Sequence, residues 1–219
     1  MLKNKFTNYI FCDEDYSKNF HYQSLYLKLF KRLKFKITSK KNFFLLNKNF
    51  KKKYLSFFKK YIKSSFYYFH LDEKWDNFRE IDRLNLIKII LNCSKKRKIV
   101  ITAGFKKFKF LHHLKEKFAT YDFNGNHFSS DYIVPNSNNI FLLTNVPINL
   151  IAYFAKNSIK NISSHAGSIV HLSAAFNRPI VDLVKKNKNY EYDRWVPLIS
   201  NYKRFNLEKI TDKSFKNIK

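Results

Sequence analysis

Short apolar runs alternate with amphipathic stretches along the chain from about residue 65 to the C-terminus. Runs that are apolar almost throughout are typical of strands buried on both faces of a parallel sheet. The runs that predict strands are residues 65–71, 98–103, 139–144, 159–163 and 179–184. Because helical patterns separate them, we expect parallel strands joined by helical crossovers.

The stretches between these runs predict helices. Within 76–93, apolar residues recur at spacings of three and four, which predicts one buried helix face; they are Phe78, Ile81, Leu84, Ile87, Ile90 and Leu91. Further helices are predicted at 108–118, 147–157, 167–176 and 207–216, whereas the polar segment 121–139 predicts a loop. The fold class is therefore α/β: a Rossmann-like, doubly wound parallel sheet within a domain that spans residues 65–219.

The first 64 residues have a different character. Segments 24–35 and 50–63 are helical in pattern and very basic, so residues 1–64 are expected to form a basic helical extension. Between Tyr16 and Leu71 there are 15 Lys and Arg and no Asp or Glu. This bias is compatible with a surface at residues 16–71 for anionic lipid headgroups or nucleic acid, although the bias alone favours the alternative that follows. A set of solvated helix faces in a lysine-rich chain is the alternative interpretation.

Lysine supplies 36 of the 43 basic residues. Nucleic-acid readers favour the arginine fork, so this composition makes nucleic acid a less favoured partner. Aromatic residues nevertheless interleave with the lysines of 50–63, as they do in stacking platforms for bases. A non-enzymatic basic module that binds RNA or an anionic membrane surface therefore stays open as the alternative function.

Cysteine content and apolar length bear on location. Cys12 and Cys93 are the two cysteines and lie far apart, which predicts a reducing compartment and no disulfide framework. Residues 1–16 lack the apolar core of a signal peptide, and no apolar stretch is long enough to span a bilayer. We expect a cytoplasmic protein, with peripheral contact at the inner face of the membrane as an option. No spacing of cysteines predicts a metal site.

Polar residues follow several predicted strands directly. Ligands of doubly wound folds bind beyond the carboxyl ends of the strands. That edge should collect the segment DEKW at 72–75, Gly104, Asn145 and the segment 163–167. In DEKW, Lys74 can reach a phosphate, although Asp72 or Asp76 acting as an ordinary helix cap would also explain the acids.

The segment HAGSIVH at 165–171 predicts a turn at Gly167 followed by a helix. The first turn of a helix leaves backbone N–H groups unpaired, and these bind phosphate readily. The alternative is an ordinary strand–helix turn, with His171 packed in the core. The sequence contains none of the motifs GxSxG, GxxxxGK[ST] or GxGxxG, which disfavours a serine hydrolase and a P-loop NTPase.

These segments together resemble a known family. HAGSIVHLSAAFNRPIVDL resembles the sugar-nucleotide-binding stretch of GT-B glycosyltransferases of the heptosyltransferase type (glycosyltransferase family 9-like). DEKW followed by F.EI resembles the Lys- and Trp-bearing motif after the first strand of that family's C-terminal domain. VITAG at 100–104 and the segment at Arg194, Trp195 and Pro197 follow in matching order. The resemblance covers roughly residues 69–209.

The resemblance implies a fold, an activity and a set of donor-binding residues. The fold is the C-terminal half of a GT-B enzyme. The activity is inverting transfer of a hexosyl or heptosyl group from a nucleotide-sugar donor to a glycan or glycolipid of the cell envelope, such as lipopolysaccharide, with no metal or other cofactor. The implied donor-binding residues are Lys74, Thr102, Gly104, His165, Ala166, Gly167, Ser168 and His171.

The chain departs from the family in two respects. His165 and Ala166 replace an acidic residue and a threonine before the glycine, and three residues instead of two separate Gly167 from the following histidine. The resemblance therefore specifies neither the donor sugar nor its nucleotide. Most of the acceptor domain has no counterpart, so residues 1–64 resemble a remnant of that domain plus a linker. We assign no catalytic base, and expect either a truncated product or an enzyme completed by another subunit.

Overall fold

The computed structural model describes residues 58, 62, 65–103, 107–123, 139–164, 167–184, 196 and 201–207. The strands are β1 (Phe66–Leu71), β2 (Lys98–Ala103), β3 (Thr120–Asp122), β4 (Ile140–Thr144), β5 (Lys160–Ser164), β6 (Ile180–Val184) and β7 (Tyr202–Asn206). The helices are the short 3₁₀ helix η3 (Glu73–Asn77), α3 (Glu80–Ser94), α4 (Lys109–Lys117), α5 (Ile148–Asn157) and α6 (Ser168–Ala175).

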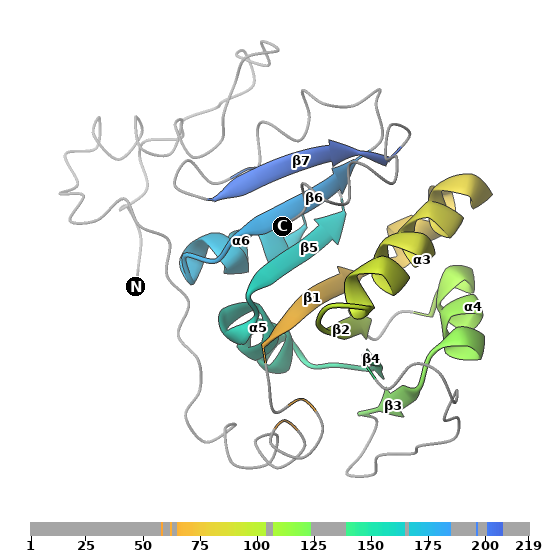
Figure 1. Cartoon of the computed structure of the whole chain (residues 1–219), viewed down its shortest axis with the longest axis horizontal. Helices are drawn as coiled ribbons and strands as arrows, with labels where there is room; N and C mark the ends of the chain where they lie inside the picture. Colours follow the sequence, from red (N-terminus) through yellow and green to blue (C-terminus); the bar gives the residue numbers. More distant parts are fainter. Residues whose placement is uncertain are drawn as a thin grey trace, which may run out of the picture.

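All seven strands form one sheet in the order β3-β4-β2-β1-β5-β6-β7, as Figure 1 shows. Every neighbouring pair is parallel. The prediction of a doubly wound, Rossmann-like parallel sheet is confirmed. This architecture follows from the apolar runs of the sequence, because strands buried on both faces need helices above and below the sheet.

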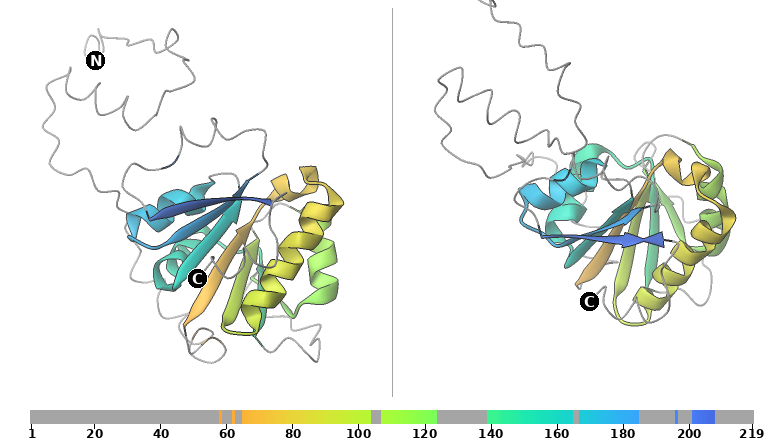
Figure 2. Two further views of the ribbon diagram at one scale, coloured as in Figure 1. Left: turned by 45° about the horizontal axis from the view of Figure 1, so that its top comes forward. Right: turned by 90° about the horizontal axis from the view of Figure 1, so that it is seen from above.

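Two layers of helices cover the sheet (Figure 2). Alternate strand residues point to opposite faces, so each strand contributes to two cores. Phe69 and Ile101 belong to the core under α3 and α4, whereas Tyr68 and Val100 belong to the core under α5 and α6. The chain thus covers one face with the helices that follow β1 and β2, and the other face with those that follow β4 and β5.

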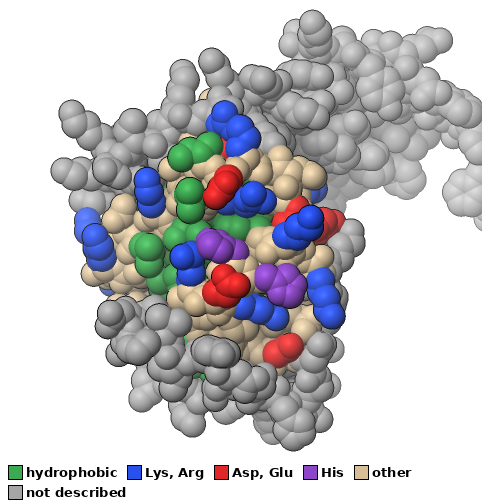
Figure 3. Space-filling view, turned by 90° about the vertical axis from the view of Figure 1, so that its right-hand side faces the viewer, with side chains coloured by type: hydrophobic (Ala, Val, Ile, Leu, Met, Phe, Trp, Pro, Cys, Tyr) green, Lys and Arg blue, Asp and Glu red, His purple; other side chains and the backbone are tan. Residues whose placement is uncertain are grey.

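The buried face of α3 differs from the prediction. Leu86, Ile87, Ile89 and Ile90 are buried, but Ile81, Leu84 and Leu91 are 51%, 40% and 44% exposed. Hydrophobic side chains therefore lie among charged ones on this side of the molecule (Figure 3). The error has a physical cause, since apolar residues occur all around this helix and their spacing does not define one face. The helical region also begins differently: η3 ends at Asn77, and the extended backbone of Phe78 and Arg79 separates it from α3.

Two strands lie where none was predicted. β3 occupies the start of the 121–139 segment and pairs with β4, and β7 pairs with β6 at the other edge. Both are edge strands whose residues are at most partly buried, so their sequences lack a continuous apolar run. The predicted helix 207–216 lies outside the described residues except for Leu207.

Phe58 and Ile62 are the described residues of the predicted extension. Ile62 is fully buried, and the ring of Phe58 packs edge-on against Phe66 and Tyr153 at centroid distances of 5.5 and 5.4 Å. At these two positions the apolar side chains of 50–63 therefore serve the core under α5. Residues 1–57 lie outside the described residues, and the extension, its membrane contact and the domain boundary at residue 64 stay predictions.

Candidate functional site at the strand-order reversal

The strand order reverses direction at β1. From β1 the chain proceeds to β2 and β4 on one side, and then returns to place β5, β6 and β7 on the other. Helices on the two sides run on opposite faces, so the carboxyl ends of β1 and β5 diverge into loops that leave the sheet in different directions. This is the switch point at which open α/β sheets bind their ligands.

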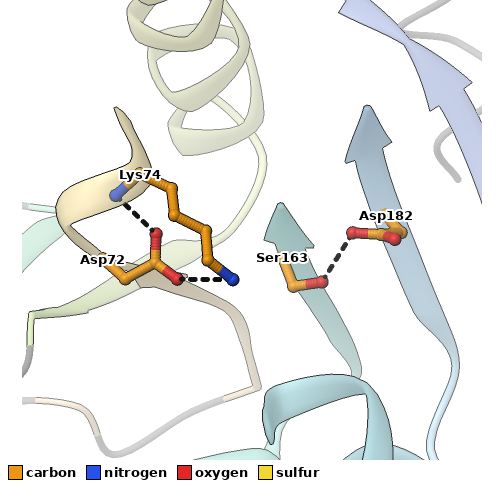
Figure 4. A network of polar contacts seen from close by, with 4 residues as sticks. All are labelled: Asp72, Lys74, Ser163 and Asp182. Carbon is orange, nitrogen blue, oxygen red and sulfur yellow. Dashed lines mark hydrogen bonds and ion pairs between the residues drawn. The ribbon is translucent and has the colours of Figure 1, made fainter. Parts of the chain in front are cut away.

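Four polar residues lie at this position: Asp72 and Lys74 follow β1, Ser163 belongs to β5 and Asp182 to the neighbouring β6 (Figure 4). The first two belong to the predicted DEKW segment. The region therefore holds one cation, two carboxylates and a hydroxyl, contributed by or directly following three adjacent parallel strands. Of these groups, the exposed Lys74 ammonium can bind an anion.

Asp72 caps η3, as the ordinary interpretation of DEKW predicts. Its Oδ1 accepts the backbone N–H of Lys74 at 3.1 Å, and its Oδ2 lies 3.9 Å from Lys74 Nζ. Burial raises the pKa of Asp72, while the positive charge of Lys74 opposes the rise. The Lys74 side chain is 49% exposed and its ion pair is at the limit of contact distance, so its ammonium remains accessible to a second anion.

Trp75 and Asp76 fix the position of this loop. Trp75 is fully buried and stacks on Phe78 at 4.4 Å, with Phe110 of α4 at 5.8 Å. The two oxygens of Asp76 accept the backbone N–H groups of Lys109 and Phe110 at 2.7 and 2.8 Å. Asp76 is thus a cap for α4, across 33 residues of sequence, rather than for the helix that follows it. These contacts hold the backbone on both sides of Lys74.

The second predicted segment begins α6 next to the end of β5. Gly167 is the N-cap residue, and its carbonyl accepts the N–H of Val170 at 2.9 Å. Its backbone angles of φ −71° and ψ −172° are open to any residue, so the glycine is not needed for a left-handed conformation. Its missing side chain instead leaves the first turn open to close approach, and Ser168 there is exposed.

An uncapped helix start does not by itself mark a site. α5 begins at Pro147, also without a side-chain cap, but it follows β4, which is two strands from β1. α6 differs because it starts at the strand-order reversal, on the opposite side of that reversal from Lys74. The positive end of its backbone dipole and the lysine ammonium therefore serve the same region.

The other predicted site residues are either outside the described residues or not shown to bind a ligand. Gly104, His165 and Ala166 lie outside the described residues, and their roles stay predictions. His171 is exposed on α6 and is not a core histidine; partial burial lowers its pKa. Thr102 is fully buried in β2. Its hydroxyl is already hydrogen-bonded within the protein, so a role in binding a donor also stays a prediction.

The sequence reasoning missed a row of polar side chains on the sheet face under α5 and α6. The register places these residues side by side on five consecutive strands; they are Thr102, His70, Ser163, Asp182 and Arg204. Ser163 Oγ donates to Asp182 Oδ1 at 2.9 Å, and the Tyr202 hydroxyl donates to Oδ2 at 2.8 Å. The available signal was a polar residue near the carboxyl end of the apolar runs of β1 and β2 and an aspartate within that of β6, whereas β5 and β7 have no such run.

Asp182 is fully buried, and its carboxylate is held by these two donors. Burial and the adjacent Asp182 charge raise the pKa of Tyr202, so the phenol keeps its proton. Such a satisfied network orders the ends of β5, β6 and β7. Within the described ranges, no group of three or more metal-ligating side chains is present. No helix in those ranges is long and apolar enough to cross a membrane.

The fold can now be compared with known proteins. No protein-family model matches the sequence, and no curated protein matches it. Among solved structures, it is similar to a glycosyl transferase of family 9 from Veillonella parvula, with a TM-score of 0.61 and 12% identity. The match covers 91% of this chain and 51% of that one. The chain has the fold of about half of a family 9 glycosyl transferase chain. The resemblance predicted from the motifs is confirmed at the level of the fold.

Two further structures match over shorter stretches. The E. coli heptosyltransferase WaaC with ADP has 13% identity and a TM-score of 0.45, covering 70% of this chain and 42% of that one. The S. aureus MnaA–UDP structure has 15% identity and a TM-score of 0.43, covering 66% and 42%. The chain spans about half of the length of the proteins that it matches or less.

Proposed function

We propose that this chain is the donor-binding part of a GT-B glycosyltransferase and holds the diphosphate of a nucleotide sugar at the switch point between β1 and β5. The observation that carries the proposal is the placement of the Lys74 ammonium and the open first turn of α6 on the two sides of the strand-order reversal. Both are positive, and they come from loops that share one sheet edge. A diphosphate is the ligand group that this arrangement suits best.

The proposed chemistry is displacement at the anomeric carbon of the sugar. The bond from that carbon to the diphosphate oxygen breaks while an acceptor hydroxyl forms a new bond on the opposite face, which inverts the centre. The hydroxyl proton passes to a base, a role to which we assign no residue. Negative charge then develops on the departing nucleoside diphosphate. Lys74 and the N–H groups of Gly167 and Ser168 stabilise that charge, and they stabilise it more strongly than in the ground state. The proposed acceptor is a glycan or glycolipid of the cell envelope.

Calorimetric titration with ADP, UDP and GDP tests the proposal. We expect at least one of the three to bind the full chain. The substitution Lys74→Met removes the ammonium group and should weaken that binding about tenfold, because a hydrogen bond to an anion is lost. Lys88→Met is the matched control, since Lys88 is an exposed lysine of α3. The proposal is wrong if none of the nucleotides binds, or if the two variants have equal effects.

A further inference from the structure

His70 is the member of the polar row that belongs to β1, between Thr102 and Ser163. It lies next to the end of β1, opposite Thr102 of β2 in the register. On the other side, Phe69 pairs with Ile162, which puts His70 level with Ser163 of β5. His70 is therefore the member of the row at the strand-order reversal, on the sheet face where α6 begins. Its neighbours in the row are held by hydrogen bonds within the protein.

A hydrogen-bond chain anchors one nitrogen of the His70 ring. The Tyr68 hydroxyl lies 2.6 Å from Thr102 Oγ1, and the same Oγ1 lies 2.9 Å from His70 Nδ1. Tyr68 and Thr102 are fully buried, whereas His70 is only partly buried. Burial raises the pKa of Tyr68, so the phenol is protonated and has one hydrogen to donate.

The direction of this chain follows from the number of protons. Tyr68 and Thr102 each have one hydroxyl hydrogen, and each buried hydroxyl needs an acceptor. If Thr102 donated to Tyr68, the hydroxyl hydrogen of Tyr68 would have no acceptor among these three side chains. If both Tyr68 and His70 Nδ1 donated to Thr102, the Thr102 hydrogen would have none. The arrangement that satisfies both runs from Tyr68 to Thr102 and from Thr102 to Nδ1.

This direction fixes the state of the ring. Nδ1 accepts a hydrogen bond and carries no hydrogen, so the hydrogen of a neutral imidazole is on Nε2. Burial lowers the pKa of His70 to about 4, which keeps the ring neutral near pH 7. The ring thus has a single N–H donor, Nε2–H, and it belongs to a residue of β1 at the strand-order reversal. As long as Thr102 donates to Nδ1, Nε2 carries the hydrogen and cannot accept a proton. His70 is therefore excluded as the catalytic base.

We infer that His70 is a further anion-binding residue of this site, whose Nε2–H donates to an oxygen of the ligand diphosphate. The inference rests on the proposed function, since the ligand it names is the donor diphosphate. Tyr68 and Thr102 are then positioning residues that keep the donor hydrogen on Nε2. The site would bind phosphate oxygens through an ammonium, a backbone helix terminus and a neutral imidazole.

Two variants of His70 test the binding role by calorimetry with the nucleoside diphosphate that binds best. His70→Ala removes the donor and should weaken binding about tenfold. His70→Gln places an amide N–H₂ near the position of Nε2 and should restore much of the loss. His112→Ala is the control, because His112 is exposed on α4, away from this face, and should leave the affinity unchanged. Far-UV circular dichroism verifies that each variant is folded.

The tautomer is tested in the unmodified protein by ¹⁵N NMR of the imidazole rings. We expect the Nε2–H form at neutral pH, and a change in the Hε2 resonance when the nucleotide binds. Thr102→Val should convert His70 into a mixture of tautomers. An Nδ1–H tautomer, or an affinity of His70→Ala equal to wild type while Lys74→Met binds weakly, would overturn the inference and leave the proposed function intact. If no nucleotide binds wild type, the proposed function fails first.

Discussion

The helices α4 and α6 both begin at the carboxyl edge of the sheet, and neither has a capping side chain at its own N-cap residue. In α4 the protein supplies the missing acceptor from a distance, because both carboxylate oxygens of Asp76 accept N–H groups of its first turn. In α6 the N-cap is Gly167, which has no side chain to serve this role. The comparison teaches that a distant side chain closes the start of α4, whereas none of the described side chains closes the start of α6, where we propose that a ligand binds.

The largest expected effect comes from closing the open helix start. Gly167→Asp introduces a preferred N-cap residue into a backbone conformation that accepts it, so the fold should persist with equal or slightly higher stability. The new carboxylate would occupy the N–H groups and repel a diphosphate. We expect nucleotide affinity to fall about 100-fold, roughly 2.7 kcal/mol, in a calorimetric titration.

Gly167→Ser separates the two causes of that effect, since it caps the helix without adding charge. Its affinity should lie between those of wild type and Gly167→Asp. If Gly167→Asp binds nucleotide as tightly as wild type while remaining folded, then α6 is not part of the ligand site.

The second expected effect concerns pH and the neutral ring of His70. Its pKa is about 4 in the folded state against an ordinary value of 6.5, so the unfolded chain binds the proton more readily between these values. The contribution of His70 to the free energy of unfolding is therefore fully present above pH 6.5 and decreases as the pH falls toward 4. Between pH 6.5 and 5 the loss should be roughly 2 kcal/mol by urea unfolding.

His70→Gln cannot titrate and should lack this part of the pH dependence. The difference between the two proteins removes contributions that other groups, such as Asp72, make equally to both. Identical slopes for the two proteins over pH 5 to 6.5 would contradict the assignment of a neutral, partly buried imidazole.

The third expected effect concerns the closed helix start. Asp76→Ala removes the acceptor for two N–H groups of α4 and should lower the free energy of unfolding by about 1–2 kcal/mol. Glu80→Ala, at an exposed position in the first turn of α3, should change it far less. Equal losses in the two variants would show that the Asp76 contacts do not stabilise α4.

The parts of the fold that could be predicted are the strands buried on both faces, because such strands have continuous apolar sequences. KIVITA and IFLLT are continuous apolar runs and form central strands. YKRFN and TYD are edge strands whose residues are at most partly buried. Because they contain polar residues, they lack the apolar run that predicts a strand. α3 was predicted as a helix, but its exposed Ile81 and Leu91 show that spacing fails where apolar residues surround the axis.

The candidate site could be predicted in part for a related reason. Lys74 and Gly167 follow directly after strands, so the sequence places them at the ligand-binding edge once a parallel sheet is assumed. His70 and Asp182 lie within strands and become neighbours of Ser163 only through the register of β1, β5 and β6. That register joins segments up to about a hundred residues apart, and no local pattern encodes it.

The most direct test of the central claim is an NMR titration of the ¹⁵N-labelled chain with ADP, UDP and GDP, monitored at backbone amides. The diphosphate should shift the amide resonances of Gly167 and Ser168 strongly, because these N–H groups lie at the start of α6. The amide of Lys74 should shift less, because Asp72 already accepts its hydrogen and the ligand would bind the Lys74 ammonium instead. The amides of Lys109 and Phe110 should stay unchanged, because Asp76 already accepts their hydrogens. Shifts confined to α4, or no shift with any of the three nucleotides, would contradict a phosphate site at this switch point.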